Sequence, residues 1–248
     1  LADDLSVGHY KVLTVGGLTN HFRVSDVQGN RLSPGKTMLG DVQVALERLS
    51  QAVSHEFFPL WIGKTIKVDY KADREVYPVS LVKNTNHFHV LLAEVGGSST
   101  GRADRPVFTF EILTPEGAVY GHDNAPRVQV PVTYMPYSLE VGEGPEVLSE
   151  GHVNTARLLY DDDYAYKLIV YDTRTGLRVW DYDLMKLLES RKPILRPDGS
   201  ALPMPEFLDR QSEWRMVILY KEGENPSGFV ALSIEVNGWI VWRNDIEV

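Results

Sequence analysis

The sequence predicts an all-β protein built from two β-sandwich domains, the first of which is incomplete at its amino-terminal side. The dominant pattern along the chain is the alternation of apolar and polar residues that is typical of half-buried strands. Gly- and Pro-containing turns separate these segments, and the 248 residues include 20 Gly and 14 Pro. Few segments have helical periodicity. Two sheets that each bury one face satisfy this combination.

The strands are predicted from alternation, segment by segment. In residues 229–236, one face carries Val230, Leu232, Ile234 and Val236. The same pattern predicts strands at residues 10–15, 65–70, 88–92, 107–112, 157–160, 167–171 and 214–220. Turn signals at residues 115–117, 173–176 and 222–226 lie between them.

One helix is predicted in the first part of the chain, at residues 41–57, with Asp41 as its N-cap. Its apolar residues recur at intervals of four, three and four, at Val42, Leu46, Leu49 and Val53. We expect this helix to lie on a sheet. A shorter helix is predicted at residues 184–189, and Pro205 at a first helical position predicts one further turn of helix.

A charged segment that is poor in apolar residues, Lys71–Glu75, marks the predicted domain boundary. Residues 76–248 then hold about seven strands, enough for a complete small sandwich. Residues 1–75 hold the predicted helix and too few strands to close two sheets. The first domain is therefore predicted to be a partial sandwich that lacks strands on its amino-terminal side.

Composition excludes several classes of function. The 34 acidic and 25 basic residues give a formal net charge of -9, which argues against binding to a nucleic-acid backbone. The chain has no Cys, which excludes disulfides, thiolate metal sites and a thiol nucleophile. Apolar runs such as residues 90–93 are far shorter than the roughly 20 residues of a membrane span. Residues 1–4 lack the basic and apolar regions of a signal peptide, which predicts a mature or trimmed start.

No catalytic, cofactor-binding or metal-binding residue is predicted. Residues 97–101 match the G-x-S-x-G pattern with Ser99 central, but the helix that a hydrolase needs after it is absent, so a polar loop is favoured. His87 and His89 have the spacing of a two-imidazole metal site, yet no third ligand follows at a convincing spacing, and alternation explains them as an outward strand face. Asp161–Asp163 offers oxygens for calcium, but it lacks the EF-hand spacing and is typical of a solvated hairpin tip.

Aromatic residues leave a second function open. A sugar-stacking platform is the alternative to core packing for four tryptophans, Trp180, Trp214, Trp239 and Trp242. Large aromatic residues of sandwiches mostly fill cores and sheet faces. A surface carbohydrate-binding or adhesin module is therefore the alternative function, and a hydrolase that uses Ser98 or Ser99 is a third hypothesis.

Short motifs occur in a fixed order along nearly the whole chain. They are Gly8–Tyr10 (GHY), Gly16–Leu18 (GGL), Val79–His87 (VSLVKNTNH), Asn124, Tyr134–Tyr137 (YMPY), Thr155–Leu159 (TARLL), Pro205–Trp214 (PEFLDRQSEW) and Ile234–Val241 (IEVNGWIV). The ordered set resembles the fimbrial anchor-subunit family of the fimbrillin superfamily, the lipoproteins that tie fimbriae to the outer membrane of Gram-negative anaerobes.

The resemblance implies two transthyretin-like sandwich domains and assembly with pilin subunits by β-strand exchange at the cell surface. It also implies an outer-membrane lipid anchor on an amino-terminal Cys, and further strands at the start of the chain, neither of which this sequence contains. A sandwich that lacks a strand exposes unpaired backbone groups beside an apolar groove, and an extended partner segment satisfies both. We therefore expect a structural fimbrial subunit without catalytic activity, cofactors or nucleic-acid partners.

Overall fold

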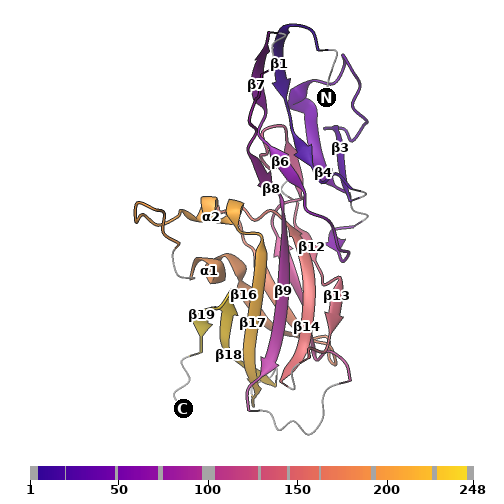
Figure 1. Cartoon of the computed structure of the whole chain (residues 1–248). Coiled ribbons are helices and arrows are strands. Elements are labelled where there is room, and N and C mark those ends of the chain that lie inside the picture. The colour runs from indigo at the N-terminus through magenta and orange to yellow at the C-terminus, as the bar shows by residue number, and fades with distance from the viewer. Residues whose placement is uncertain are drawn as a thin grey trace.

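The protein is an elongated, nearly all-β molecule with an upper and a lower lobe (Figure 1), which confirms the predicted fold class. The computed structural model describes residues 5–19, 21–47, 50–71, 75–96, 104–127, 130–143, 146–161, 163–190, 194–224 and 228–244. The amino-terminal end lies in the upper lobe and the carboxyl-terminal end in the lower lobe. No helix of these residues is long and apolar enough to cross a membrane.

Two sheets form the lower lobe. The six-stranded sheet has the order β13 (Ser138–Glu140), β14 (Val147–Ala156), β9 (Thr85–Glu94), β17 (Glu213–Glu222), β18 (Phe229–Val236) and β19 (Trp239–Arg243). The five-stranded sheet has the order β16 (Arg178–Asp183), β15 (Lys167–Asp172), β10 (Phe108–Thr114), β12 (Val132–Tyr134) and β5 (Ala52–Val53).

The core lies between these sheets. Alternate residues of β9, among them Phe88 and Val90, are fully buried, and Phe108 and Phe110 of β10 are buried with them. The sheets approach closely at Gly151 of β14, where an added Cβ would lie 2.8 Å from a ring carbon of Phe110. The lower lobe is therefore a covered sandwich in which each sheet buries the face of the other.

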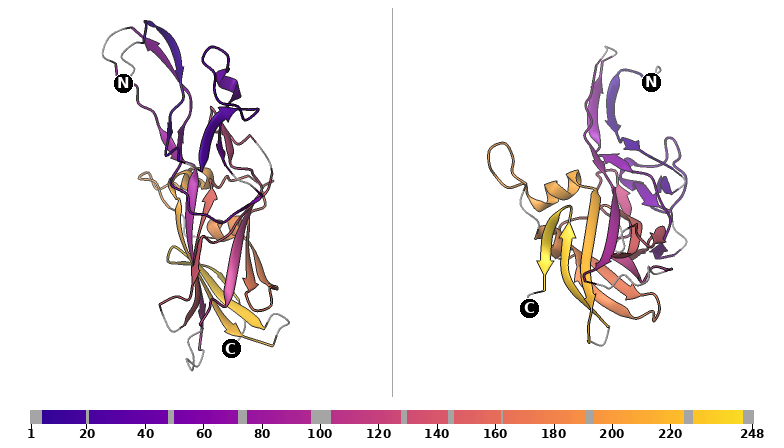
Figure 2. Two further views of the ribbon diagram at one scale, coloured as in Figure 1. Left: turned by 90° about the vertical axis from the view of Figure 1, so that its right-hand side faces the viewer. Right: turned by 60° about the horizontal axis from the view of Figure 1, so that its bottom comes forward.

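Three smaller sheets form the upper lobe. They are the pair β1 (Gly8–Val12) and β7 (Ile66–Tyr70); the sheet of β2 (Val15–Gly16), β6 (Trp61–Gly63) and β8 (Leu81–Lys83); and the sheet of β11 (Val119–Gly121), β4 (Val42–Leu46) and β3 (Phe22–Asp26). Figure 2 shows that the β1–β7 pair and the β3–β4 strands extend upward as two separate prongs.

The predicted helix at residues 41–57 is wrong. A short 3-10 turn, η1 (Leu39–Asp41), leads into β4, and β5 follows. Val42, Val44 and Leu46 are buried while the residues between them are half-exposed, so period two determines the structure of this segment. The helical spacing that led to the prediction includes Leu49, which lies outside the described residues. β-branched residues at alternate positions favour the strand.

Two other strand predictions need correction. Residues 157–160, predicted as a strand, are irregular and follow the end of β14. The bounds of β18 are as predicted, but its first half faces the opposite way: Phe229 and Ala231 are buried instead of Val230 and Leu232. A register shift against β17 at this point causes the reversal, because one extra residue moves the following side chains to the other face.

The described part of the chain contains two α-helices, both short, and both lie where the sequence predicts them. α1 (Leu184–Glu189) begins after Asp183, whose side chain accepts a hydrogen bond from the backbone N–H of Lys186. α2 (Met204–Arg210) contains Pro205 in its first turn.

Strand pairing crosses residue 75, where the sequence predicts a domain boundary. β8 pairs with β6, β11 pairs with β4, and β12 pairs with β5. Segments from the second half of the chain thus complete sheets of the first half, and the boundary itself stays a prediction.

Candidate functional site

The β1–β7 pair is an amphipathic ribbon whose apolar side chains are only partly buried. Tyr10 lies opposite Val68, and Val12 lies opposite Ile66. None of the residues in either strand is buried, and Val12 is 38% exposed. An isolated two-stranded ribbon is at best marginally stable in water, so this apolar face is a candidate surface for a partner.

The opposite face of the same ribbon is polar. His9 and Asp69 lie opposite each other, and Nδ1 of His9 is 3.1 Å from Oδ1 of Asp69. Lys11 lies opposite Lys67. Within the described residues, no third strand pairs with β1 or β7, although the hydroxyl of Tyr77 donates to the backbone carbonyl oxygen of Asp69 in β7 at 3.0 Å.

The motif residues of the sequence meet in a buried polar network where the two lobes join. The side-chain amide of Asn84, between β8 and β9, donates to Oδ1 of Asn124 at 2.6 Å. Arg157 donates its backbone N–H to the carbonyl oxygen of Asn84 at 2.9 Å. Both asparagines are buried. Because buried polar groups are costly unless paired, this network fixes one arrangement of the three segments.

A second part of the network lies one step along β9. The indole N–H of Trp214 donates to Oδ1 of Asn86 at 3.1 Å, and the amide of Asn86 donates to the carbonyl oxygen of Ala156 at 2.8 Å. Trp214 is only 2% exposed and packs against Phe88. Trp214 is therefore a core residue, as the favoured interpretation of the tryptophans expects, and it is not available for the alternative sugar-stacking platform.

Asp209 forms an ion pair with Arg157. It lies in the last turn of α2 and accepts hydrogen bonds from Nε and Nη2 of Arg157. The Arg157 side chain is only 14% exposed. The TARLL and LDR motifs, which are 52 residues apart at this pair, thus meet as an ion pair that holds α2 against the end of β14.

Two motif glycines have conformational roles. Gly17 has φ +77°, and an added Cβ would lie 1.9 Å from the carbonyl oxygen of Pro59. Asn237 and Gly238 have φ +49° and +85° and form the tight turn between β18 and β19, as expected for a hairpin turn that needs positive φ twice. These motif residues therefore specify turns and close backbone contacts of the fold.

Glu116 is an acidic side chain buried in the connection between β10 and β11. It is 2% exposed, and it accepts a hydrogen bond from the hydroxyl of Tyr166. Burial raises the pKa of Glu116 to about 7, although the Tyr166 hydrogen bond opposes the shift. The sequence predicts a turn at residues 115–117, and nothing in the local pattern signals that Glu116 is buried.

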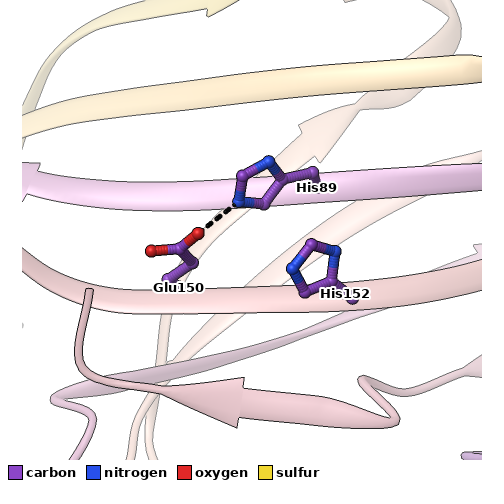
Figure 3. Close-up of side chains that lie close together, drawn as sticks. All are labelled: His89, Glu150 and His152. Atoms are coloured by element: carbon purple, nitrogen blue, oxygen red, sulfur yellow. Dashed lines mark hydrogen bonds and ion pairs between the residues drawn. The ribbon is translucent and has the colours of Figure 1, made fainter. Parts of the chain in front are cut away.

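A cluster of histidines and a glutamate lies on the outer face of the six-stranded sheet (Figure 3). His89 of β9 lies directly opposite His152 of β14, and their rings stack with centroids 4.4 Å apart. Nε2 of His89 is 2.6 Å from Oε1 of Glu150. One donor atom from each of the three residues lies within 4.8 Å of the others.

His87 extends this cluster. Its Nε2 atom is 3.1 Å from Nδ1 of His152, and its Nδ1 atom is 3.0 Å from Oε2 of Glu213 on β17. Burial, and then the neighbouring His89 and His87, lower the pKa of His152. Glu150 and His152 belong to another strand, so they are far from His87 and His89 in the sequence. Because strand pairing is not visible in a single sequence, the sequence gives no sign of these further ligands.

The other candidate sites considered from the sequence are the G-x-S-x-G segment, the run of aspartates and the remaining tryptophans. Residues 97–101, with the G-x-S-x-G pattern, lie outside the described residues, as does Asp162. The backbone N–H of Asp163 donates to Oδ1 of Asp161 in an exposed turn. Of the other tryptophans, Trp180 and Trp242 pack against the core, and Trp239 is 49% exposed.

Comparison with known proteins gives a consistent assignment. A candidate adhesin from Bacteroides ovatus, of known structure, is 42% identical to this chain and covers 99% of it and 78% of its own length, with a TM-score of 0.86. A candidate polysaccharide-binding protein from Bacteroides thetaiotaomicron is 26% identical over 98% of this chain and 78% of its own, with a TM-score of 0.74. No curated protein matches.

A protein with lower sequence identity has a similar fold. The fimbrial anchor protein Mfa2 from Porphyromonas gingivalis has a TM-score of 0.67 over 96% of this chain and 77% of its own, at 15% identity. The family profile described as "Fimbrillin-A associated anchor proteins Mfa1 and Mfa2" matches residues 1–245. This chain therefore belongs to the family of fimbrillin-A associated anchor proteins.

Proposed function

We propose that this chain is a structural subunit that anchors a fimbria to the outer membrane, and that the β1–β7 ribbon accepts an extended strand from a neighbouring pilin. Membership of the anchor family supports a role at the cell surface. The observation that carries the proposal is the amphipathic ribbon, with half-exposed apolar residues and no third strand among the described residues.

Strand addition fits the ribbon in two ways. An added strand pairs its backbone N–H and C=O groups with an open edge, and its alternate side chains extend the apolar face and pack beside it. Tyr10, Ile66 and Val68 are the residues of that face. Binding of this kind requires no catalytic group and no cofactor, and we assign none to the chain. The net charge of -9 also argues against a nucleic-acid partner.

A matched pair of variants tests the ribbon. Val68→Ser alters the apolar face of β7, and Lys67→Ser alters the polar face at the neighbouring position of the same strand. We expect a synthetic strand peptide from the cognate pilin to raise the melting temperature of the wild-type chain and of Lys67→Ser. The rise should be much smaller for Val68→Ser, because the peptide then covers a polar hydroxyl.

The same variants are then assayed in cells. Val68→Ser should release fimbriae into the medium, whereas Lys67→Ser should retain them on the envelope. Equal peptide stabilisation of both variants, together with equal retention of fimbriae, would exclude the ribbon as the strand acceptor.

Membrane attachment is tested separately. The family resemblance implies a lipid on an amino-terminal Cys of the native protein, and the printed sequence contains no Cys. We expect intact-mass measurement of the protein extracted from cell envelopes to give a longer, acylated form. A native protein without lipid would argue for a shaft or tip position in the fimbria.

Carbohydrate binding is the second candidate function. The similarity to a candidate polysaccharide-binding protein and a hollow lined by Trp180, Tyr182 and Trp242 favour it. Saturable binding on a glycan array that is lost in Trp242→Ala would support this function. Absence of any glycan signal would leave the structural role alone.

A further inference from the structure

The outer face of the six-stranded sheet carries a cluster of potential metal ligands that the anchoring role does not use. Its residues alternate with core residues: Phe88 and Val90 flank His89 in β9 and are fully buried. Gly151, between Glu150 and His152, faces the core and packs against Phe110. The backbone that presents the three side chains is therefore held in place by the packed sandwich beneath it.

We propose that His89, Glu150 and His152 form a binding site for a divalent transition-metal ion of the zinc type. Two imidazoles and one carboxylate are a donor set that zinc accepts, whereas calcium and magnesium prefer oxygen ligands alone. The site draws one ligand from β9 and two from β14, so a bound ion links these two strands.

The distances suit a metal after small side-chain movements. Three donor atoms lie within 4.8 Å of one another. Donors of a tetrahedral zinc ion, at the usual bond lengths, lie about 3.4 Å apart. Rotation of the side chains closes this difference while the strands stay paired. The ion would take the place of the direct 2.6 Å contact between Nε2 of His89 and Oε1 of Glu150.

His87 and Glu213 support the ligand His152 from the other side. Nδ1 of His152 contacts Nε2 of His87 at 3.1 Å, so we assign Nε2 of His152 to the metal (Figure 3). Glu213 in turn contacts Nδ1 of His87 at 3.0 Å. A carboxylate that orients a histidine behind a metal ligand is a recurrent feature of metal sites, and its loss typically weakens binding.

The surrounding charges allow a cation to bind. Arg215 of β17 lies next to His89 in the sheet, but its guanidinium is 3.7 Å from a carboxylate oxygen of Glu235, on the side away from the cluster. Lys83 is paired with Glu213 at 2.7 Å. Three protein ligands leave at least one coordination position for water or for a donor from another molecule.

The test is calorimetric titration of the whole purified chain with Zn²⁺, in the presence and absence of EDTA. We expect one ion per chain and a higher melting temperature with the ion bound. Glu150→Gln keeps the shape of the side chain and should weaken Zn²⁺ binding at least about tenfold, as should His152→Ala. A Co²⁺ absorption spectrum typical of mixed nitrogen and oxygen ligands should appear in the wild type and be lost in both variants.

Two control variants separate this site from adventitious histidine binding. His9→Ala removes a histidine on the β1–β7 ribbon. His21→Ala breaks a second stacked pair, His21 and His55, whose ring centroids are 4.3 Å apart. Neither change should alter the affinity. The proposal is overturned if wild type fails to bind Zn²⁺ up to about 1 mM, or if the double variant His89→Ala, His152→Ala binds as tightly as the wild type. Melting curves in EDTA establish that each variant is folded.

Discussion

The β1–β7 ribbon and the six-stranded sheet share one sequence pattern but differ in cover. In β17, the alternate residues Met216 and Ile218 are fully buried against the other sheet of the lower lobe. In β7, the alternate residues Ile66 and Val68 remain half-exposed. Both strands have a clear apolar face, and only one of these faces has a second layer of protein over it.

This difference shows that the alternation of apolar and polar residues predicts which face of a strand is apolar. It does not predict what packs against that face. A covered apolar face stabilises the chain that carries it, by roughly 25 cal/mol for each Å² removed from water. An uncovered face gives that stabilisation only when another molecule supplies the cover. Under the proposed function, a bound pilin strand would therefore add to the stability of the β1–β7 ribbon.

The largest expected effect comes from the same substitution made in both regions. Ile218→Ala removes fully buried atoms and should lower the free energy of unfolding by about 2 to 5 kcal/mol. Ile66→Ala removes half-exposed atoms and should cost less than about 1 kcal/mol in the isolated chain. Chemical denaturation of the two variants measures both values.

A strand peptide sharpens this first comparison. If a pilin segment covers the ribbon, the cost of Ile66→Ala should rise once the peptide is bound, while that of Ile218→Ala should stay constant. A cost for Ile66→Ala that already equals that of Ile218→Ala without peptide would mean that the ribbon is covered within the chain.

The ionisation of Glu116 should make the stability of the folded protein depend on pH. Its pKa is about 7 in the folded protein and about 4.3 in an unfolded chain. The folded state therefore binds the proton more tightly, and stability is present below pH 4 and is lost as the pH rises to about 7. The linkage relation gives a loss of about 4 kcal/mol across this window. Glu116→Gln should remove this loss, because the amide oxygen can still accept the Tyr166 hydrogen bond.

Urea denaturation at pH 5 and at pH 8 measures the effect. The free energy of unfolding of the wild type should be lower at pH 8 than at pH 5. For Glu116→Gln this decrease should be smaller, and the difference between the two proteins is the contribution of Glu116. Identical pH dependence in both proteins would show that Glu116 is solvated in the folded state.

A substitution at the junction between the lobes should have an effect of intermediate size on stability. Asp209→Asn removes the charge that faces Arg157, whose side chain is 14% exposed. A hydrogen bond to a charged group contributes about 1.5 to 3 kcal/mol, so we expect a cost of about 2 kcal/mol in thermal denaturation. Asp198→Asn, in an exposed turn, is the control, and an equal effect of the two changes would contradict a special role of the pair.

Much of the fold was predictable because it depends on local pattern. The bounds of β18 and α1 follow from alternation and from a capping aspartate. The helix predicted at residues 41–57 failed because four apolar residues at helical spacing also include two positions of a period-two strand, Val42 and Leu46. Short apolar runs fit both periods, and tertiary pairing decides between them.

The candidate sites were less predictable because they depend on contacts between distant segments. Alternation correctly placed His87 and His89 on an outward face, but their neighbours Glu150 and His152 come from β14, about 60 residues later. The Arg157 and Asp209 pair was visible only as two motifs of a family. A register between strands, which a single sequence does not specify, brings each of these groups together.

Trp239 gives the smallest expected effect and tests whether cover also decides stability within the lower lobe. Substitution of a fully buried tryptophan by Ala costs about 3 to 5 kcal/mol. The ring is 49% exposed at the edge of the six-stranded sheet, so a cost of about 1 kcal/mol is expected. Trp214→Ala, at a residue that is 2% exposed, should cost several times more in the same melting experiment. If both substitutions cost the same, exposure would not be the property that separates covered from uncovered regions. If Trp239→Ala costs little and also abolishes binding to a glycan, the exposed ring would be a contact for sugar and the adhesin function would gain support.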